Sequence, residues 1–490
     1  MLDLAGCWTL SDESGAQVIA FDLPGDGISA LVRAGVLPDP YWGRNEYDCR
    51  WVCERDWVAT RTFTVDRTDL RLEIDMLDTV AEVFVNGLSV LKAENMFHRH
   101  VAYHLPSLRL GENEISIRFA SPVREGARRQ AEMPFFIPYL AQNCPIPNGN
   151  MLRKPACDFG WDWNIALAPF GVYGDIRLVP NGRQVIYTPV IQQVHSPGEV
   201  EVHVTAWLSG GDLDAEVTLA CGGETTTQKA RHGKVTLSVT LNDPQLWWPN
   251  GQGDQPLYDL TLTSGEATWS CRIGLREMEL ITEKDAVGTG FKFRVNGRDV
   301  FAKGANWIPA DALASNITQA SVRGLLQSAI DANMNMIRVW GGGRYEPDWF
   351  YDLCDEMGLM VWQDFMFACN LYPSTDDFIS VVRQEAFEQV RRLHHHACIA
   401  LWCGDNELIG ALTWFPESRA NRDRYLVNYD RLNRAIELQA RNADPALNWW
   451  PSSPSPGPMS FGDAWHDDSA GDMHFWSVWH EGKDFDHYRD

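Results

Sequence analysis

Glu407 follows an apolar run, at a position where a side chain could perform acid–base chemistry. The run Ile399–Cys403 predicts a buried strand, and the next residues are Gly404, Asp405, Asn406 and Glu407. In parallel α/β folds, the side chains that do chemistry lie just past the carboxyl ends of the strands. A carboxyl group held there can donate and accept protons at a reacting oxygen. Glu407 is therefore the first candidate catalytic residue.

The region that contains Glu407 alternates apolar strands with amphipathic helices. Helices are predicted over 319–332, with Thr318 as N-cap, over 346–357 and over 378–394. This alternation predicts a (β/α)8 TIM barrel over residues 284–490, which would be the catalytic domain. A barrel needs eight strands, so we expect it to be incomplete in this chain. The six predicted strands cover 300–303, 334–340, 359–365, 399–403, 446–450 and 473–476.

Before residue 284 the sequence predicts two all-β domains. Residues 1–182 contain short alternating runs, such as 60–65, 81–85 and 114–119, with a turn signal at Asn86-Gly87. This even spacing predicts a jelly-roll β-sandwich, and its long irregular stretch, 135–164, is expected to be functional. The alternation over 183–283 predicts an immunoglobulin-like β-sandwich of about 100 residues, which we expect to be a spacer.

Several segments, taken in order, resemble a known family. LWCGDNEL at 401–408 is similar to the acid/base motif of family-two glycoside hydrolases, and most like that of the β-mannosidases among them. The resemblance covers essentially the whole chain. It implies a retaining, exo-acting hydrolase of terminal non-reducing β-D-mannose residues that works by double displacement and needs no cofactor, because two carboxylates suffice. The other matching segments lie at 39–57, 77–87, 159–163, 246–258, 303–311, 338–346, 361–373, 449–454 and 471–480.

The resemblance assigns roles to residues at the predicted strand ends. Glu407 corresponds to the acid/base, which must hold a proton near neutral pH and is therefore expected to have a raised pKa. Asn406 corresponds to the residue that contacts the sugar 2-hydroxyl. Arg338 corresponds to the arginine that pairs with the nucleophile and keeps it ionised. From its position alone, Arg338 could instead form a salt bridge that closes the barrel.

The resemblance also implies the walls of the −1 subsite. Trp340, Trp161 and Asp162 are expected to line it, because a tryptophan face suits the apolar side of a pyranose and a carboxylate accepts from sugar hydroxyls. Asp162 lies in the long irregular stretch, which would then close one side of the pocket. His474 and Trp476 are expected to face the pocket, with buried packing as the alternative.

Two departures from the family pattern bear on activity. Asp405 stands where the family usually has asparagine, and it either shifts the pKa of Glu407 or faces solvent. The family nucleophile is a glutamate in a segment resembling S-E-F-G, and the 490 residues contain no such segment. We therefore expect a truncated chain that is inactive alone. The alternatives are a non-catalytic carbohydrate-binding relative and another family-two exo-glycosidase, a β-glucuronidase or an exo-glucosaminidase.

Composition limits the possible partners. With 66 acidic and 42 basic residues, the net charge of −24 disfavours nucleic acid and anionic membrane surfaces. The expected partner is a small molecule or oligosaccharide with a terminal β-mannose, and the oligomeric state stays open. Eleven cysteines without a CxxC pair, and a start that does not read as a secretion signal, predict reduced thiols and a cytoplasmic location. One or two of the three histidines at 394–396 are expected to cap a helix, and no carboxylate or second histidine pair is expected to complete a metal site there.

Overall fold

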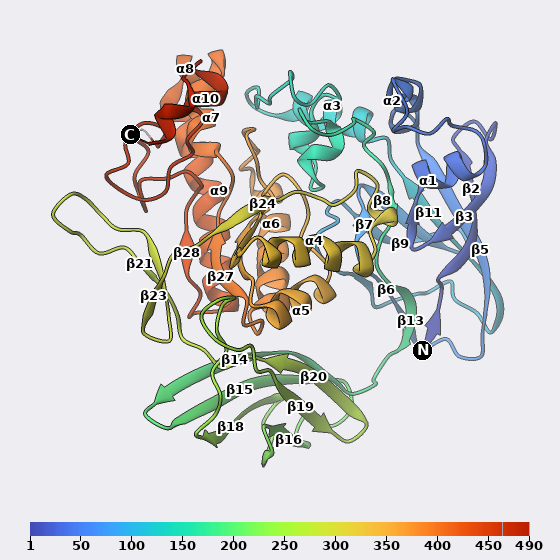
Figure 1. The fold of residues 1–490 in the computed structure, drawn as a ribbon. Helices are drawn as coiled ribbons and strands as arrows, with labels where there is room; N and C mark the ends of the chain where they lie inside the picture. The colour runs from blue at the N-terminus through green and yellow to red at the C-terminus, as the bar shows by residue number, and fades with distance from the viewer. Residues whose placement is uncertain (463, 490) are drawn as a thin grey trace.

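The computed structural model describes residues 1–462 and 464–489, and its first 180 residues form a β-sandwich (blue to teal in Figure 1). Buried side chains alternate with more exposed ones along strands such as 81–85 and 111–119, and the buried ones build a core around Trp8, Trp57 and Phe119. The six-stranded sheet has the order β3 (Val18–Leu23), β2 (Gly6–Asp12), β5 (Trp57–Val65), β11 (Gly111–Phe119), β8 (Ala81–Val85), β9 (Leu88–Ala93). A four-stranded sheet has the order β1 (Leu2–Asp3), β13 (Ile176–Pro180), β6 (Leu70–Ile74), β10 (His100–Ala102). A three-stranded sheet has the order β4 (Gly25–Asp26), β12 (Gly171–Val172), β7 (Leu77–Asp78).

The three runs predicted as strands in this region are confirmed, since they lie within β5, β8 and β11. Asn86 and Gly87, with φ of 49° and 79°, join β8 to β9 as the two-residue hairpin turn that their types predict. The stretch 135–164 is irregular, as predicted, and contains two short 3-10 turns. The helical segments of this region are α1 (Gly27–Arg33), α2 (Asn45–Cys49), η1 (Arg50–Glu54), α3 (Pro122–Glu132), η2 (Gly149–Met151) and η3 (Ala156–Phe159).

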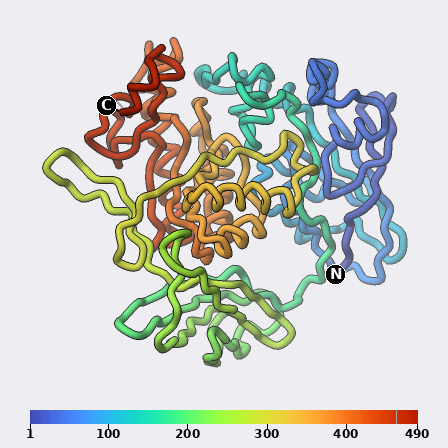
Figure 2. Tube along the Cα trace, in the orientation of Figure 1, coloured from blue at the N-terminus to red at the C-terminus, as the bar shows by residue number. Residues whose placement is uncertain are grey.

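A second β-sandwich follows and lies at the bottom of Figures 1 and 2, in green. Its strands alternate buried and exposed side chains, which gives a separate core of aliphatic residues. One sheet has the order β14 (Val185–Ser196), β15 (Glu199–Ser209), β18 (Lys234–Asn242). The other has the order β17 (Glu224–Lys229), β16 (Glu216–Cys221), β19 (Tyr258–Ser264), β20 (Ala267–Ile273).

A five-stranded parallel sheet dominates the remainder of the chain. Its strands β26 and β27 are buried along their whole length, as expected for a parallel sheet covered by helices. The order is β24 (Gly304–Trp307), β25 (Met336–Val339), β26 (Met360–Asp364), β27 (Ile399–Cys403), β28 (Trp449–Trp450). The helical segments are η4 (Ala314–Asn316), α4 (Gln319–Asp331), α5 (Asp348–Met357), α6 (Asp376–Leu393), α7 (Leu408–Trp414), α8 (Pro416–Ala420), α9 (Arg422–Ala443), α10 (Ser477–His480) and η5 (Phe485–Tyr488). Thr318 caps α4 as predicted, because its side chain accepts from the Ser321 amide.

Two of the six predicted strands are wrong. The run 300–303 was expected to open the parallel sheet, but it overlaps an antiparallel sheet of β21 (Met278–Ile281), β22 (Lys292–Val295) and β23 (Arg298–Val300). The first parallel strand is β24, a few residues later. Residues 473–476 form no strand and lead into α10, because their aromatic side chains contact neighbouring loops and helices rather than a sheet. Among the described residues the parallel sheet therefore has five strands, and the TIM barrel stays a prediction.

The first sandwich is joined to the helices of the parallel sheet by buried charges. Arg153, from the irregular stretch, makes two hydrogen bonds to Glu385 of α6, at 2.6 and 3.0 Å. Asn95 and Tyr345 donate to the same carboxylate, both at 2.8 Å. These contacts hold the irregular stretch against the sheet. In the described part of the chain, no helix has the length and apolar character needed to cross a membrane.

Candidate active site

Glu407 lies just past β27, where the chain leaves the sheet and enters α7. Its φ of 69° is in the left-handed region, and its amide donates to the Ser453 carbonyl at 2.9 Å. This conformation is uncommon for a residue other than glycine and persists where surrounding contacts impose it. The side chain is 12% exposed, with Oε1 2.7 Å from His474 Nδ1 and with the Cys369 thiol donating to Oε2 at 3.2 Å. Both carboxylate oxygens are therefore held in place.

The surroundings of Glu407 contradict the expected raised pKa. Burial raises the pKa of this carboxyl, but the hydrogen bond and charge of His474, the Cys369 thiol and the Arg338 guanidinium together outweigh burial. The net pKa therefore lies below the ordinary glutamate value. The sequence argument missed this because the histidine that lowers the pKa of Glu407 lies 67 positions further along the chain.

Asn406 and Arg338 form a hydrogen-bonded row beside this carboxylate. Arg338 Nη2 donates to Asn406 Oδ1 and to Asp364 Oδ2, both at 2.8 Å. Asn406 Nδ2 donates to the Cys369 thiol at 3.2 Å, so both ends of the amide are fixed. Arg338 thus makes a salt bridge to Asp364 on the neighbouring strand β26, which is a different contact from the barrel-closing bridge given as the alternative. Its pairing with a nucleophile stays a prediction.

Trp340, just after β25, meets two tryptophans from the first sandwich. Its ring packs edge-on against Trp161 and Trp163, with ring centroids 4.9 and 5.6 Å away. The irregular stretch therefore reaches the carboxyl end of the parallel sheet, as its length indicated. Trp163, which sequence reasoning passed over, is 40% exposed beside the buried Trp340. Asp162 lies between the two tryptophans and is exposed, and its approach to a sugar stays a prediction.

Asp405 is only 1% exposed, so the alternative that it faces solvent is wrong. Its Oδ1 accepts from the Leu408 amide at 3.1 Å and from the Ser452 hydroxyl, and its Oδ2 accepts from Asn433 at 3.4 Å. Burial is the largest influence and exceeds these uncharged donors, which raises the pKa of Asp405 to about 7. The carboxyl holds together the turn from β27 into α7.

His474 has partners on both sides of its ring. Nδ1 faces Glu407, while Nε2 lies 2.9 Å from the Ser453 hydroxyl, which in turn donates to Asp472 at 2.7 Å. Trp476 is 44% exposed and its ring packs near that of His480, so buried packing is wrong for this residue. No contact described for Trp476 reaches Glu407, and its pocket role stays a prediction.

Two family models match this chain. Residues 8–174 match the "Glycosyl hydrolase 2 galactose-binding domain-like" model, and residues 184–276 match "Glycosyl hydrolases family 2". Together they cover more than half of the 490 residues. The chain belongs to glycosyl hydrolase family 2.

Relatives within family 2 include several β-mannosidases. The chain is 33% identical to the goat (Capra hircus) β-mannosidase, an alignment that covers 95% of this chain and 56% of the goat protein. The crystal structure of a β-D-mannosidase from Dictyoglomus thermophilum is 31% identical, with a TM-score of 0.89 over 99% of this chain and 61% of that one. An exo-chitosanase from Amycolatopsis orientalis, 17% identical with a TM-score of 0.69, shares the fold. The chain thus spans somewhat more than half the length of these curated relatives.

Sequence reasoning missed four residues that surround the side chains of Glu407, Asn406 and Arg338. Asp364 could have been predicted from the sequence, because it stands at the end of an apolar strand, the same kind of position that drew attention to Glu407. Cys369, Ser453 and Asp472 lie in segments that resemble the family, but these segments are irregular and no strand or helix pattern predicts which side chains meet. Tertiary structure alone brings them to the end of β27.

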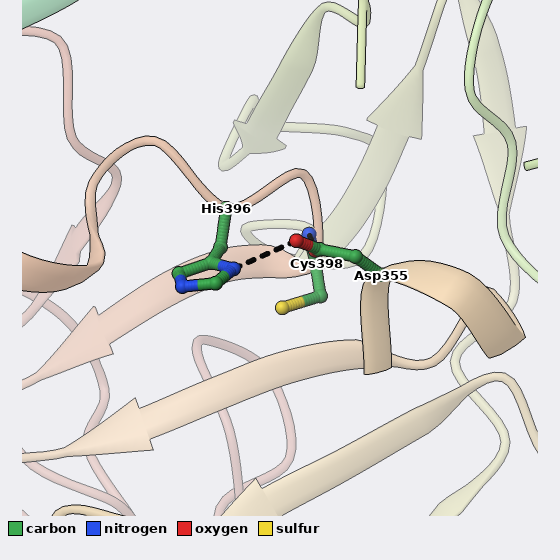
Figure 3. A group of neighbouring side chains, drawn as sticks. All are labelled: Asp355, His396 and Cys398. Carbon is green, nitrogen blue, oxygen red and sulfur yellow. Dashed lines mark hydrogen bonds and ion pairs between the residues drawn. The ribbon is translucent and has the colours of Figure 1, made fainter. Parts of the chain in front are cut away.

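Away from Glu407, one group of side chains in the described part of the chain has the residue types of a metal site. Asp355, His396 and Cys398 place their ligand atoms within 4.8 Å of one another (Figure 3), so the expectation that no carboxylate lies near these histidines is wrong. The carboxylate is already occupied, because it lies 2.7 Å from His396 Nδ1 and accepts from the Cys398 amide at 2.7 Å. Figure 3 shows the other ring nitrogen pointing away. We interpret the cluster as a buried set of hydrogen bonds that links α5 to the residues just before β27. His394 caps α6, as predicted, through its hydrogen bond to the Arg391 carbonyl.

Proposed function

We propose that the chain supplies the acid/base side of a retaining, exo-acting β-mannosidase. The observation that carries this proposal is Glu407, held between His474 and Cys369 at the end of the fourth parallel strand and flanked by Asn406 and Arg338. Relatives about one-third identical are named β-mannosidases, which supports terminal non-reducing β-D-mannose as the substrate. The partner would be a small molecule or an oligosaccharide that carries this sugar.

In this proposal Glu407 acts in both steps of a double displacement. It protonates the glycosidic oxygen as the bond to the leaving group breaks, and it then takes a proton from the water that attacks the glycosyl-enzyme intermediate. Asn406 binds the sugar 2-hydroxyl. The reaction also needs a second carboxylate about 5–5.5 Å from the first, as the nucleophile. We assign that role to a glutamate in a segment resembling S-E-F-G, outside these 490 residues, and pair it with Arg338.

The aromatic residues beside Glu407 would bind the sugar in the −1 subsite. Trp340, supported by Trp161, presents an apolar surface suited to one face of the pyranose ring. In this proposal Asp162, on the same loop as Trp161, accepts hydrogen bonds from sugar hydroxyls, and Trp476 reaches the rim of the pocket. Two carboxylates suffice for this chemistry, so the proposal includes no cofactor. The eleven free cysteines support a reducing, cytoplasmic setting.

Glu407→Gln tests the proposal in the protein expressed from the whole reading frame, including any codons beyond residue 490. We expect cleavage of β-mannosides with poor leaving groups to fall by about 10²–10⁴-fold, because these need a proton from the enzyme. A nitrophenyl β-mannoside, whose leaving group needs little protonation, should lose much less in its first step. The measurement is kcat/KM for both substrate types.

Glu114→Gln is the matched control, because Glu114 also follows an asparagine but its side chain is exposed on β11. It should leave both rates unchanged. Equal losses on both substrate types in Glu407→Gln would contradict the acid role. Cleavage of a glucuronide or glucosaminide in place of the mannoside would show that the proposed substrate is wrong. Sugar binding without any turnover would favour a carbohydrate-binding protein.

A further inference from the structure

Four side chains form a hydrogen-bonded row that begins at Glu407 Oε1. His474 Nδ1 lies 2.7 Å from Oε1, and His474 Nε2 lies 2.9 Å from the Ser453 hydroxyl. Ser453 donates to Asp472 Oδ2 at 2.7 Å. Asp472 is itself anchored, because its Oδ1 accepts from the Trp450 indole at 2.6 Å and from the Ser455 amide at 2.9 Å.

The number of hydrogens in this row determines the protonation of the imidazole. A serine hydroxyl has one hydrogen, and the Asp472 carboxylate can only accept, so that hydrogen lies between Ser453 and Asp472. The bond between Ser453 and His474 must then use a hydrogen on Nε2. On the other side of the ring, an ionised Glu407 can only accept, which requires a hydrogen on Nδ1 as well. His474 beside an ionised Glu407 is therefore an imidazolium.

We propose that Glu407 and His474 share one proton, and that Ser453 and Asp472 are positioning residues that keep the second imidazole hydrogen on Nε2. The inference rests on the proposed acid/base function of Glu407. The shared proton has two places along one short hydrogen bond. When the proton is on His474 Nδ1, the two residues form an ion pair. When it is on Glu407 Oε1, the glutamate is a carboxylic acid beside a neutral imidazole. Nε2 carries a hydrogen in both forms.

This arrangement explains how a carboxyl with a lowered pKa can still supply a proton. The two groups share one short hydrogen bond, and the lowered pKa of Glu407 means that the carboxyl readily leaves the shared proton on His474. The same bond returns that proton to Glu407 when the carboxyl needs it. When Glu407 protonates the glycosidic oxygen, the pair gives up that proton, and it regains one from the attacking water.

The groups around the pair favour the same assignment. Arg338 and the neutral Cys369 thiol face Glu407 and stabilise its charge, while Asp472 balances the imidazolium through Ser453. The ring of Trp465 packs edge-on to His474, with centroids 5.7 Å apart. The negative side chains on both sides of His474 make it the cation of the row.

The test is the protonation of both His474 nitrogens, measured by long-range 1H–15N correlation on this chain labelled with 15N-histidine. His474→Gln identifies the signals by their loss. Near pH 6 we expect a hydrogen on Nε2 and the Nδ1 signal between its charged and neutral positions or at the charged one. An Nε2 without hydrogen at this pH would overturn the inference. This readout needs no substrate, so failure of the mannosidase assay leaves it intact and the two proposals fail separately.

Ser453→Ala removes the acceptor of the Nε2 hydrogen. The pH at which the pair loses the shared proton should then fall by about one unit, which corresponds to the free energy of one hydrogen bond from a charged donor. Asp472→Asn should move it in the same direction while keeping the side-chain shape. Ser452→Ala is the matched control, because the neighbouring buried serine bonds to Asp405 instead. A shift equal to that of the control would show a general effect of a lost hydroxyl and would refute the positioning role.

Discussion

Asp405→Asn should change how the stability of the protein depends on pH. Asp405 is buried among uncharged donors, and its pKa of about 7 lies above the 3.8 of an ordinary aspartate. A raised pKa in the folded state means that stability is fully present below 3.8 and is lost as pH rises through about 7. The difference of about three pH units corresponds to about 4 kcal/mol. Asparagine has nearly the same shape and no charge, so the variant should lack this loss.

The measurement is the free energy of unfolding in urea, for wild type and variant, at several pH values from 4 to 8. We expect the variant to gain about 4 kcal/mol relative to wild type across this range, whatever the constant offset from its altered hydrogen bonds. Asp259→Asn, at an exposed position of β19, is the control and should show no such trend. A difference between Asp405→Asn and wild type that stays constant with pH would show that Asp405 is ionised in the folded protein throughout, and would refute the argument.

Two further predictions concern the contacts that place the site. Glu385→Ala should lower the free energy of unfolding, measured by urea titration, by about 3–5 kcal/mol, because it leaves Arg153 charged and buried without its partner. Glu437→Ala, which breaks a half-exposed pair with Arg441, should lower it by at most about 1 kcal/mol. Similar losses in the two variants would contradict the argument from burial. Gly342→Ala places a methyl group against the Trp340 ring and should reduce kcat/KM for β-mannosides at least tenfold, while Gly324→Ala, with nothing within 4 Å, should leave it unchanged. An active Gly342→Ala protein would show that the position of Trp340 is not needed.

The sequence predicted well those features that depend on neighbouring residues. The helix that begins after Thr318, the hairpin at Asn86-Gly87 and the strand before Glu407 all follow from periodicity and local hydrogen bonding. The strand expected at 473–476 is wrong because its apolar run reflects side chains that pack in loops. The pattern of residue types cannot distinguish such a segment from a strand of a sheet. Arg338 illustrates a third case, since its end-of-strand position is clear from sequence but the choice of Asp364 as partner depends on which strands are neighbours.

Three buried carboxyls near the ends of β26 and β27 show why burial alone does not distinguish Glu407, the proposed acid/base. Asp364 pairs with Arg338, Asp405 meets only uncharged donors, and Glu407 faces a histidine. Burial raises the pKa of the first two, whereas in Glu407 the histidine and its neighbours reverse the shift. The side chains of the two aspartates are closed to solvent, but that of Glu407 remains partly open. Glu407 is thus the partly exposed carboxyl of the three and also the one that faces a histidine, and this arrangement requires contacts from three separate segments of the chain.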